Sequence, residues 1–166
     1  MKTNSNSYTI IYSAIIVVVV AFLLAFVYQA LKPMQEANVA LDQKKQVLYS
    51  LNIRGLDNAA AEATYNKVVK EEKTVDGSKM FICNVNGATK YVFTMKGMGL
   101  WGGISGYVSV NADKSTVYGA YFNHEGETAG LGAEIKDNQK WQEKFQGKQL
   151  FKGNDHSSIA LSVQKK

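Results

Sequence analysis

The hydrophobic residues are concentrated near the N-terminus. No charged residue occurs between Thr3 and Leu31, and the stretch from Tyr8 to Leu31 is almost entirely aliphatic or aromatic. A helix of about 20 apolar residues crosses the hydrocarbon core of a bilayer. The pattern therefore predicts a membrane-spanning helix that closes at Pro33.

A cleaved signal peptide is the competing interpretation of this segment. The apolar part of a signal peptide is only about 7–15 residues long and leads to a small-x-small cleavage site. Here the apolar run continues into Phe26-Val27-Tyr28-Gln29, and Tyr8 and Tyr12 lie near its other end, where interfacial aromatic residues are expected. We therefore predict an uncleaved anchor over residues 1–33 and a soluble domain over residues 34–166.

Two helices are expected to follow the span. Apolar residues recur at roughly helical spacing from Met34 to Ile53, with charges between them, and Arg54-Gly55 is typical of a helix end. Asn58 is a suitable N-cap for a second helix from Ala59 to about Glu72.

The pattern then changes to the two-residue period of strands. Asp76-Gly77 and Asn86-Gly87 favour tight hairpin turns, and residues 111–115 have the composition of a turn. The expected strands are Lys79–Val85, Thr89–Met95, Ile104–Val110 and Thr116–Asn123. We expect the last two of these to pair.

A short helix and two short strands are expected to finish the chain. Asp137 is the predicted N-cap of that helix, which runs through Trp141 and Phe145 and stops at Gly147. The strand candidates are Gln149–Lys152 and Ser158–Val163. The order helix, helix, strands, helix, strands indicates an α+β fold, in which a mixed helix and antiparallel-sheet domain follows the transmembrane helix.

Composition narrows the range of partners. The 166 residues include 19 Lys and Arg against 14 Asp and Glu, a formal net charge of +5. These charges are interspersed, without a block of one sign or a stacked-aromatic motif, so we expect no nucleic-acid partner. Cys83 is the single cysteine, so it forms no internal disulfide and does not indicate the compartment.

The glycines indicate a candidate binding site, because nine of the 14 fall between Gly97 and Gly132. Such a concentration indicates unusual backbone conformations or close approach to another group. Residues 97–102 match G-x-G-x-x-G, but a dinucleotide fingerprint must open a helix, whereas residues 104–110 alternate like a strand. Trp101, within this cluster, either folds back onto the core or forms a platform for a planar ring ligand.

The second glycine cluster begins with three titratable residues, His124, Glu125 and Glu127. No second His or Cys stands at metal-ligand spacing, and no nucleophile signature accompanies His124. We therefore expect neither a metal site nor a catalytic acid or base in this chain.

Together, the two clusters resemble a known family. GMGLWGGISGYVSV at residues 97–110 and GETAGLGAEI at residues 126–135 are similar to the flavin-binding domain of the C subunit of the sodium-translocating NADH:quinone reductase, and to the G subunit of the related Rnf electron-transport complex. The resemblance extends to the single span and to the charged helix ANVALDQKKQVLYSLNIRG. It implies an FMN-carrying subunit that passes single electrons within a respiratory complex, whose other subunits share NADH oxidation, quinone reduction and sodium passage.

The resemblance also implies which residues lie near the flavin. The first loop is represented by Gly99, Leu100, Trp101 and Gly102, and the second by Glu127, Thr128, Gly130, Leu131 and Gly132. Ala129 stands where the family usually has proline, a change expected to loosen the turn.

The family attaches FMN through its phosphate to a threonine in an S-G-[AG]-T motif near the C-terminus. No threonine follows Thr128 in this sequence, and Ser157, Ser158 and Ser162 lack the glycine-rich context. We therefore expect a C-terminally incomplete flavin domain, with FMN absent or only weakly bound.

The resemblance further implies a single-pass protein of the bacterial inner membrane, with the bilayer and other membrane subunits as partners. It places the soluble domain on the periplasmic or outer face, although Lys32, Lys44 and Lys45 after the span slightly favour a cytoplasmic domain. Two alternatives from other classes remain open. One is a pilin-like structural subunit, although the span has no acidic residue near its start, and the other is an anchored module that binds peptide or polysaccharide at Trp101.

Overall fold

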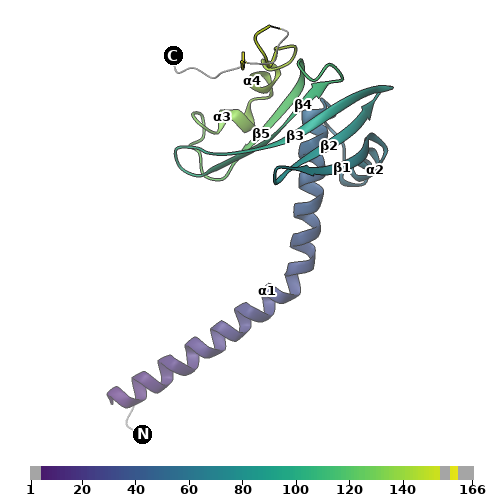
Figure 1. Ribbon diagram of the computed structural model, residues 1–166. Helices are drawn as coiled ribbons and strands as arrows, with labels where there is room; N and C mark the ends of the chain where they lie inside the picture. The colour runs from purple at the N-terminus through teal and green to yellow at the C-terminus, as the bar shows by residue number, and fades with distance from the viewer. Residues whose placement is uncertain (1–4, 154–157, 161–166) are drawn as a thin grey trace. The chain divides into compact units, whose positions relative to one another are not determined.

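The computed structural model describes residues 5–153 and 158–160. Two helices, five strands and two short helices follow one another along the described chain (Figure 1). The chain divides into two compact units, Met1–Ala40 and Leu41–Lys166. The long apolar N-terminal helix and the antiparallel sheet with helices confirm the predicted α+β class.

The first unit is formed by the N-terminal part of helix α1, which spans Asn6–Ser50. Pro33 lies inside this helix, so the amphipathic segment continues directly from the apolar one, as expected. Within the described residues, α1 is the one helix long and apolar enough to cross a membrane, and none of its most apolar stretch is buried. Such exposure of aliphatic side chains is what a lipid environment requires.

The second unit begins with the last turns of α1, where Val47, Leu48 and Leu51 are buried. The helix ends at Ser50, earlier than the predicted end at Arg54-Gly55, because Asn52 already has a left-handed φ of 61°. Asparagine tolerates this conformation when its side chain is bonded locally. The Asn52 amide donates to the carbonyl of Tyr118 at 3.0 Å.

Helix α2 spans Asn58–Val68, and its N-cap is Asp57 rather than the predicted Asn58. The Asp57 carboxylate accepts a hydrogen bond from the Ala60 N–H at 2.8 Å. The predicted extension to Glu72 is wrong, since Val69–Val75 forms strand β1. This strand lies at the sheet edge and is almost wholly exposed, so its charged residues do not alternate with apolar ones.

The five strands form an antiparallel sheet in the order β1-β2-β3-β4-β5, each strand pairing with the next. Beyond β1 they are β2 Ser78–Val85, β3 Ala88–Met98, β4 Gly103–Asn111 and β5 Val117–His124. The predicted strands are confirmed to within a few residues. Both predicted dipeptide turns have positive φ at each residue, the geometry of type I′ hairpins.

Different segments cover the two faces of the sheet. The end of α1 and helix α2 pack on one face, against a cluster that includes Phe81, Cys83 and Val92. The segment after β5 packs on the other, where the rings of Trp141 and Phe145 contact Phe122. Both faces of the central strands are therefore partly dry, which holds the strand ends in fixed register.

Two short helices follow β5, α3 over Glu134–Asp137 and α4 over Gln139–Glu143. Asp137 is the last residue of α3, so the predicted cap is wrong by one position. Asn138 caps α4 because its side chain accepts from the Trp141 N–H at 3.2 Å. Gly147, with a φ of 71°, follows the helical segment as expected.

The two predicted C-terminal strands are reduced to isolated bridges among the described residues. Thr116 bridges to Gln149, and Phe151 bridges to Ile159. The end of the second candidate, at residues 161–163, lies outside the described residues, as do Ser157 and Ser162.

Candidate functional site

The two glycine clusters become neighbouring loops at one end of the sheet. The first loop, residues 99–102, joins β3 to β4 and is closed by a bond from the Gly99 N–H to the Gly102 carbonyl at 2.8 Å. The second loop, residues 125–133, follows β5. Pairing of β4 with β5 continues into a bond from the Glu125 N–H to the Gly103 carbonyl at 3.0 Å, which brings the two loops together.

Glu127 connects the two loops through its carboxylate. Its Oε1 accepts a hydrogen bond from the backbone N–H of Trp101 at 3.0 Å. The same carboxylate fills the space that a side chain would need at Gly99 and at Gly132, where an added Cβ would lie 2.5 Å from Oε2. Both positions therefore require glycine for reasons of space, and Glu127 acts as a clamp between the loops.

Two neighbours of Glu127 extend this hydrogen-bonded arrangement. The backbone N–H of Glu127 donates to Nδ1 of the half-buried His124 at 3.2 Å, so the ring accepts there. Oε2 of Glu125 accepts from the Gly103 N–H at 3.2 Å. The acidic and imidazole side chains that begin the second cluster thus bind backbone groups.

The second loop contains a tight turn at Thr128. The Thr128 carbonyl accepts from the N–H groups of Leu131 and Ala133, both at 3.1 Å. Gly130 has a φ of 71°, which identifies residues 128–131 as a type II turn with Ala129 at its second position. Proline is favoured at that position because its fixed φ suits the turn. The turn forms here with alanine in its place.

The outer side of the loops is apolar. Leu100 and Trp101 of the first loop are 81% and 69% exposed, Leu131 of the second is 73% exposed, and the adjacent Met98 is 83% exposed. We refer to these four side chains as the loop surface. Trp101 does not fold back onto the core, so that alternative is wrong. Exposed apolar side chains on a hydrogen-bonded backbone are typical of a surface that binds something.

The nine predicted site residues divide into two groups. Those on the outside are Leu100, Trp101, Thr128, Gly130 and Leu131. Those that form the contact between the loops are Gly99, Gly102, Glu127 and Gly132. Sequence reasoning missed the positioning contacts of His124 and Glu125, because spacing alone does not show that a side chain turns back toward the backbone.

Other chemistry finds little support in this region. The G-x-G-x-x-G string joins two antiparallel strands and opens no helix. Within residues 5–153 and 158–160, no group of three or more His, Cys, Asp or Glu side chains could hold a metal ion.

Comparison with known proteins gives the family. The FMN-binding domain family matches residues 99–162, beginning at the first loop. The crystal structure of the C subunit of the Na(+)-translocating NADH-quinone reductase from Parabacteroides distasonis is 36% identical, with a TM-score of 0.67, and the match covers 73% of this chain and 71% of that chain. The chain belongs to the family of C subunits of the Na(+)-translocating NADH-quinone reductase.

Curated members of this C-subunit family align over different extents. The Haemophilus ducreyi protein is 29% identical over 98% of this chain and 78% of its own length. The Vibrio parahaemolyticus protein is 31% identical over 74% of this chain and 48% of its own length. These relatives are named as parts of an oxidoreductase complex, so the pilin-like and polysaccharide-binding alternatives give way to the C-subunit family.

Proposed function

We propose that this chain is a membrane-anchored electron-transfer subunit of a Na(+)-translocating NADH-quinone reductase and that it holds FMN against the loop surface. The observation that carries the proposal is the clamp by Glu127, which joins two glycine loops and leaves Leu100, Trp101 and Leu131 exposed beside them. The match of the FMN-binding domain from Gly99 onward supports the same location.

The residues on the loops fit a planar ring with an apolar face and a polar edge. Trp101 and Leu100 offer apolar surface on which a ring can stack, and the exposed Thr128 offers a hydroxyl for a polar edge. Bound FMN would supply the redox chemistry, while the protein supplies orientation and partial exclusion of water. No side chain of this chain is required as an acid or base, and NADH oxidation, quinone reduction and sodium passage belong to the assembled complex.

We further propose that residues 1–33 anchor the chain in the inner membrane by a single span and that residues 34–166 form the flavin domain on the outer face. The apolar, unburied stretch of α1 supports the span. The subunits named for the relatives support a multi-subunit complex as the partner.

The attachment of FMN is a separate question. The 166 residues contain no threonine after Thr128. We therefore propose that FMN held by these residues rests on loop contacts without a covalent bond. A denaturing gel of the purified chain should show no flavin fluorescence, and a fluorescent band would identify a covalent site within the chain.

The proposed site is tested by titrating FMN with the full chain in nanodiscs and following the quenching of flavin fluorescence. Trp101→Ala should weaken FMN affinity about 5- to 10-fold, the effect expected from losing one aromatic stacking partner. Trp141→Phe is the matched control, because Trp141 packs against Phe122 and Phe145 on a different part of the fold. Equal affinity of the wild type and Trp101→Ala would contradict the site.

A further inference from the structure

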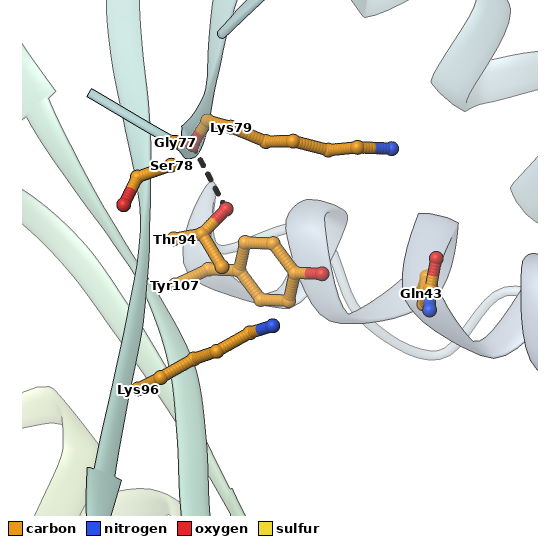
Figure 2. A pocket seen from close by; sticks show the side chains of 7 residues that line it. All are labelled: Gln43, Gly77, Ser78, Lys79, Thr94, Lys96 and Tyr107. Carbon is orange, nitrogen blue, oxygen red and sulfur yellow. Dashed lines mark hydrogen bonds between the residues drawn. The ribbon is translucent and has the colours of Figure 1, made fainter. Parts of the chain in front are cut away.

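A second concavity lies on the face of the sheet that α1 covers, and no residue of the two glycine loops lines it (Figure 2). Its volume is about 400 Å³, within the range of small-molecule sites. The polar side chains around it are Gln43, Ser78, Lys79, Thr94, Lys96 and Tyr107. We refer to it as the lysine cavity.

Three strands and one helix bring these side chains together. Thr94 of β3 pairs with Tyr107 of β4, and Lys96 follows two positions later in β3, so the three side chains share one face. The Thr94 hydroxyl donates to the carbonyl of Lys79 at 2.9 Å, which ties in the start of β2. Gln43 approaches from α1, opposite the Tyr107 hydroxyl (Figure 2).

The charge of the lysine cavity is positive and uncompensated by ion pairs. In the described part of the chain, the ion pairs join Lys32, Lys44 and Lys73 to glutamates, and none involves Lys79 or Lys96. No carboxylate lines the cavity. Two lysines that share a cavity without counter-charge repel each other, so an anion between them is favoured.

Tyr107 adds a neutral donor to the two ammonium groups. Burial raises the pKa of its phenol, and the charges of Asp42 and Glu72 act in the same direction, so the hydroxyl stays protonated at neutral pH. Those two carboxylates oppose an anion. Each is bonded to a neighbour outside the cavity, Asp42 to the Gln46 amide at 2.6 Å and Glu72 to the Tyr65 hydroxyl at 2.6 Å.

We propose that the lysine cavity binds a phosphate group, with Lys79 and Lys96 supplying charge and Tyr107 and Gln43 supplying hydrogen bonds. Phosphate suits this arrangement because it carries up to two charges and accepts hydrogen bonds from several directions at once. Soluble phosphomonoesters and phospholipid headgroups share this chemistry. The proposal does not depend on FMN at the glycine loops.

The test uses the full chain in nanodiscs, with isotope-labelled lysine side chains observed by NMR. In zwitterionic lipid, glycerol 3-phosphate is added against sodium chloride of equal ionic strength. The signals of Lys79 and Lys96 should shift saturably, while that of Lys140, an exposed lysine of α4, should not. The same signals are then compared between zwitterionic discs and discs that contain phosphatidylglycerol.

The two arms distinguish the source of the phosphate. Saturation by glycerol 3-phosphate supports a soluble ligand, and a shift confined to phosphatidylglycerol discs supports a lipid headgroup. The double variant Lys79→Gln/Lys96→Gln should weaken the effective arm about tenfold or more, because charge-assisted hydrogen bonds are lost. Asp42→Asn should strengthen binding by removing an opposing charge.

Both lysines are exposed, so their replacement should leave the fold intact, which circular dichroism and thermal unfolding check. No saturable shift in either arm would overturn the proposal. An unchanged affinity in the double variant, with the fold intact, would overturn it equally.

Discussion

At the scale of single residues, Glu127 determines the arrangement of the glycine loops. Its carboxylate binds the Trp101 N–H and excludes side chains from Gly99 and Gly132. The sequence resemblance marks Glu127 as a residue near the flavin, whereas the structure gives it a role in joining the loops. A carboxylate that accepts a backbone hydrogen bond is fixed in place without contacting a ligand.

Replacing Glu127 should loosen the first loop. Glu127→Ala leaves the Trp101 N–H without its acceptor, which should cost about 1 kcal/mol of stability and reduce the protection of that amide from hydrogen exchange. Glu127→Gln should keep most of the protection because its amide oxygen still accepts. Glu143→Ala in α4 serves as control, and equal exchange at Trp101 in Glu127→Ala and wild type would exclude the clamp.

Buried tyrosines make the second unit sensitive to alkali. Burial raises the pKa of Tyr121 to about 12, the charge of Asp42 adds to this, and that of Arg54 opposes it. An unfolded chain ionises the phenol near its ordinary pKa of 10.0, while the folded chain keeps it neutral. Stability from this group is therefore present below that value and is lost as the pH rises toward about 12.

The expected result is a free energy of unfolding that falls between about pH 10 and pH 12, and falls less steeply in Tyr121→Phe. Urea unfolding of the full chain at a series of pH values measures it. Tyr118→Phe is the control, because no raised pKa is assigned to that less buried tyrosine in the same strand. Identical slopes for wild type and Tyr121→Phe would contradict the assignment.

At the scale of elements, the sequence predicted best where local chemistry decides the conformation. The Asp76-Gly77 and Asn86-Gly87 turns and the strands around them follow directly from residue type. Strand β1 was missed because an exposed edge strand needs no apolar alternation, and only pairing with β2 makes it a strand. The ends of α1 and α2 depend on side-chain bonds of Asn52 and Asp57, which residue preference locates only to within a few positions.

The candidate site was predictable to a different degree. Glycine clustering and the resemblance locate both loops, and the structure places them together through the β4–β5 pairing. Which residues face outward could not be read from the sequence, since glycine loops have no periodicity that assigns a face. The separation of Glu127 from Trp101, as clamp and exposed surface, therefore required the three-dimensional structure.

The type II turn at residues 128–131 gives a prediction at the element scale. Ala129→Pro should stabilise the second unit by about 0.4–1 kcal/mol, because proline restricts the unfolded chain and matches the turn's second position. Gly130→Ala should destabilise it, since φ is 71° there. Denaturant unfolding of both variants measures this, and a destabilised Ala129→Pro would mean that the turn differs from type II.

At the scale of the whole molecule, an apolar helix is combined with a domain that carries the loops. The span and the soluble domain belong to separate compact units. If the domain lies on the outer face, as we propose, protease added to intact spheroplasts should digest residues 34–166, while a cytoplasmic marker protein stays intact. Protection of the domain until the membrane is permeabilised would reverse the orientation.

The central claim is that FMN lies against the loop surface. The chain has two tryptophans, Trp101 on the first loop and Trp141 packed against Phe122 and Phe145, and their indole N–H signals are resolved by NMR of the full chain in nanodiscs. Added FMN should shift the Trp101 indole signal saturably through the ring current of the flavin and leave that of Trp141 in place. A saturable shift of Trp141 alone, or of neither tryptophan, would contradict the claim.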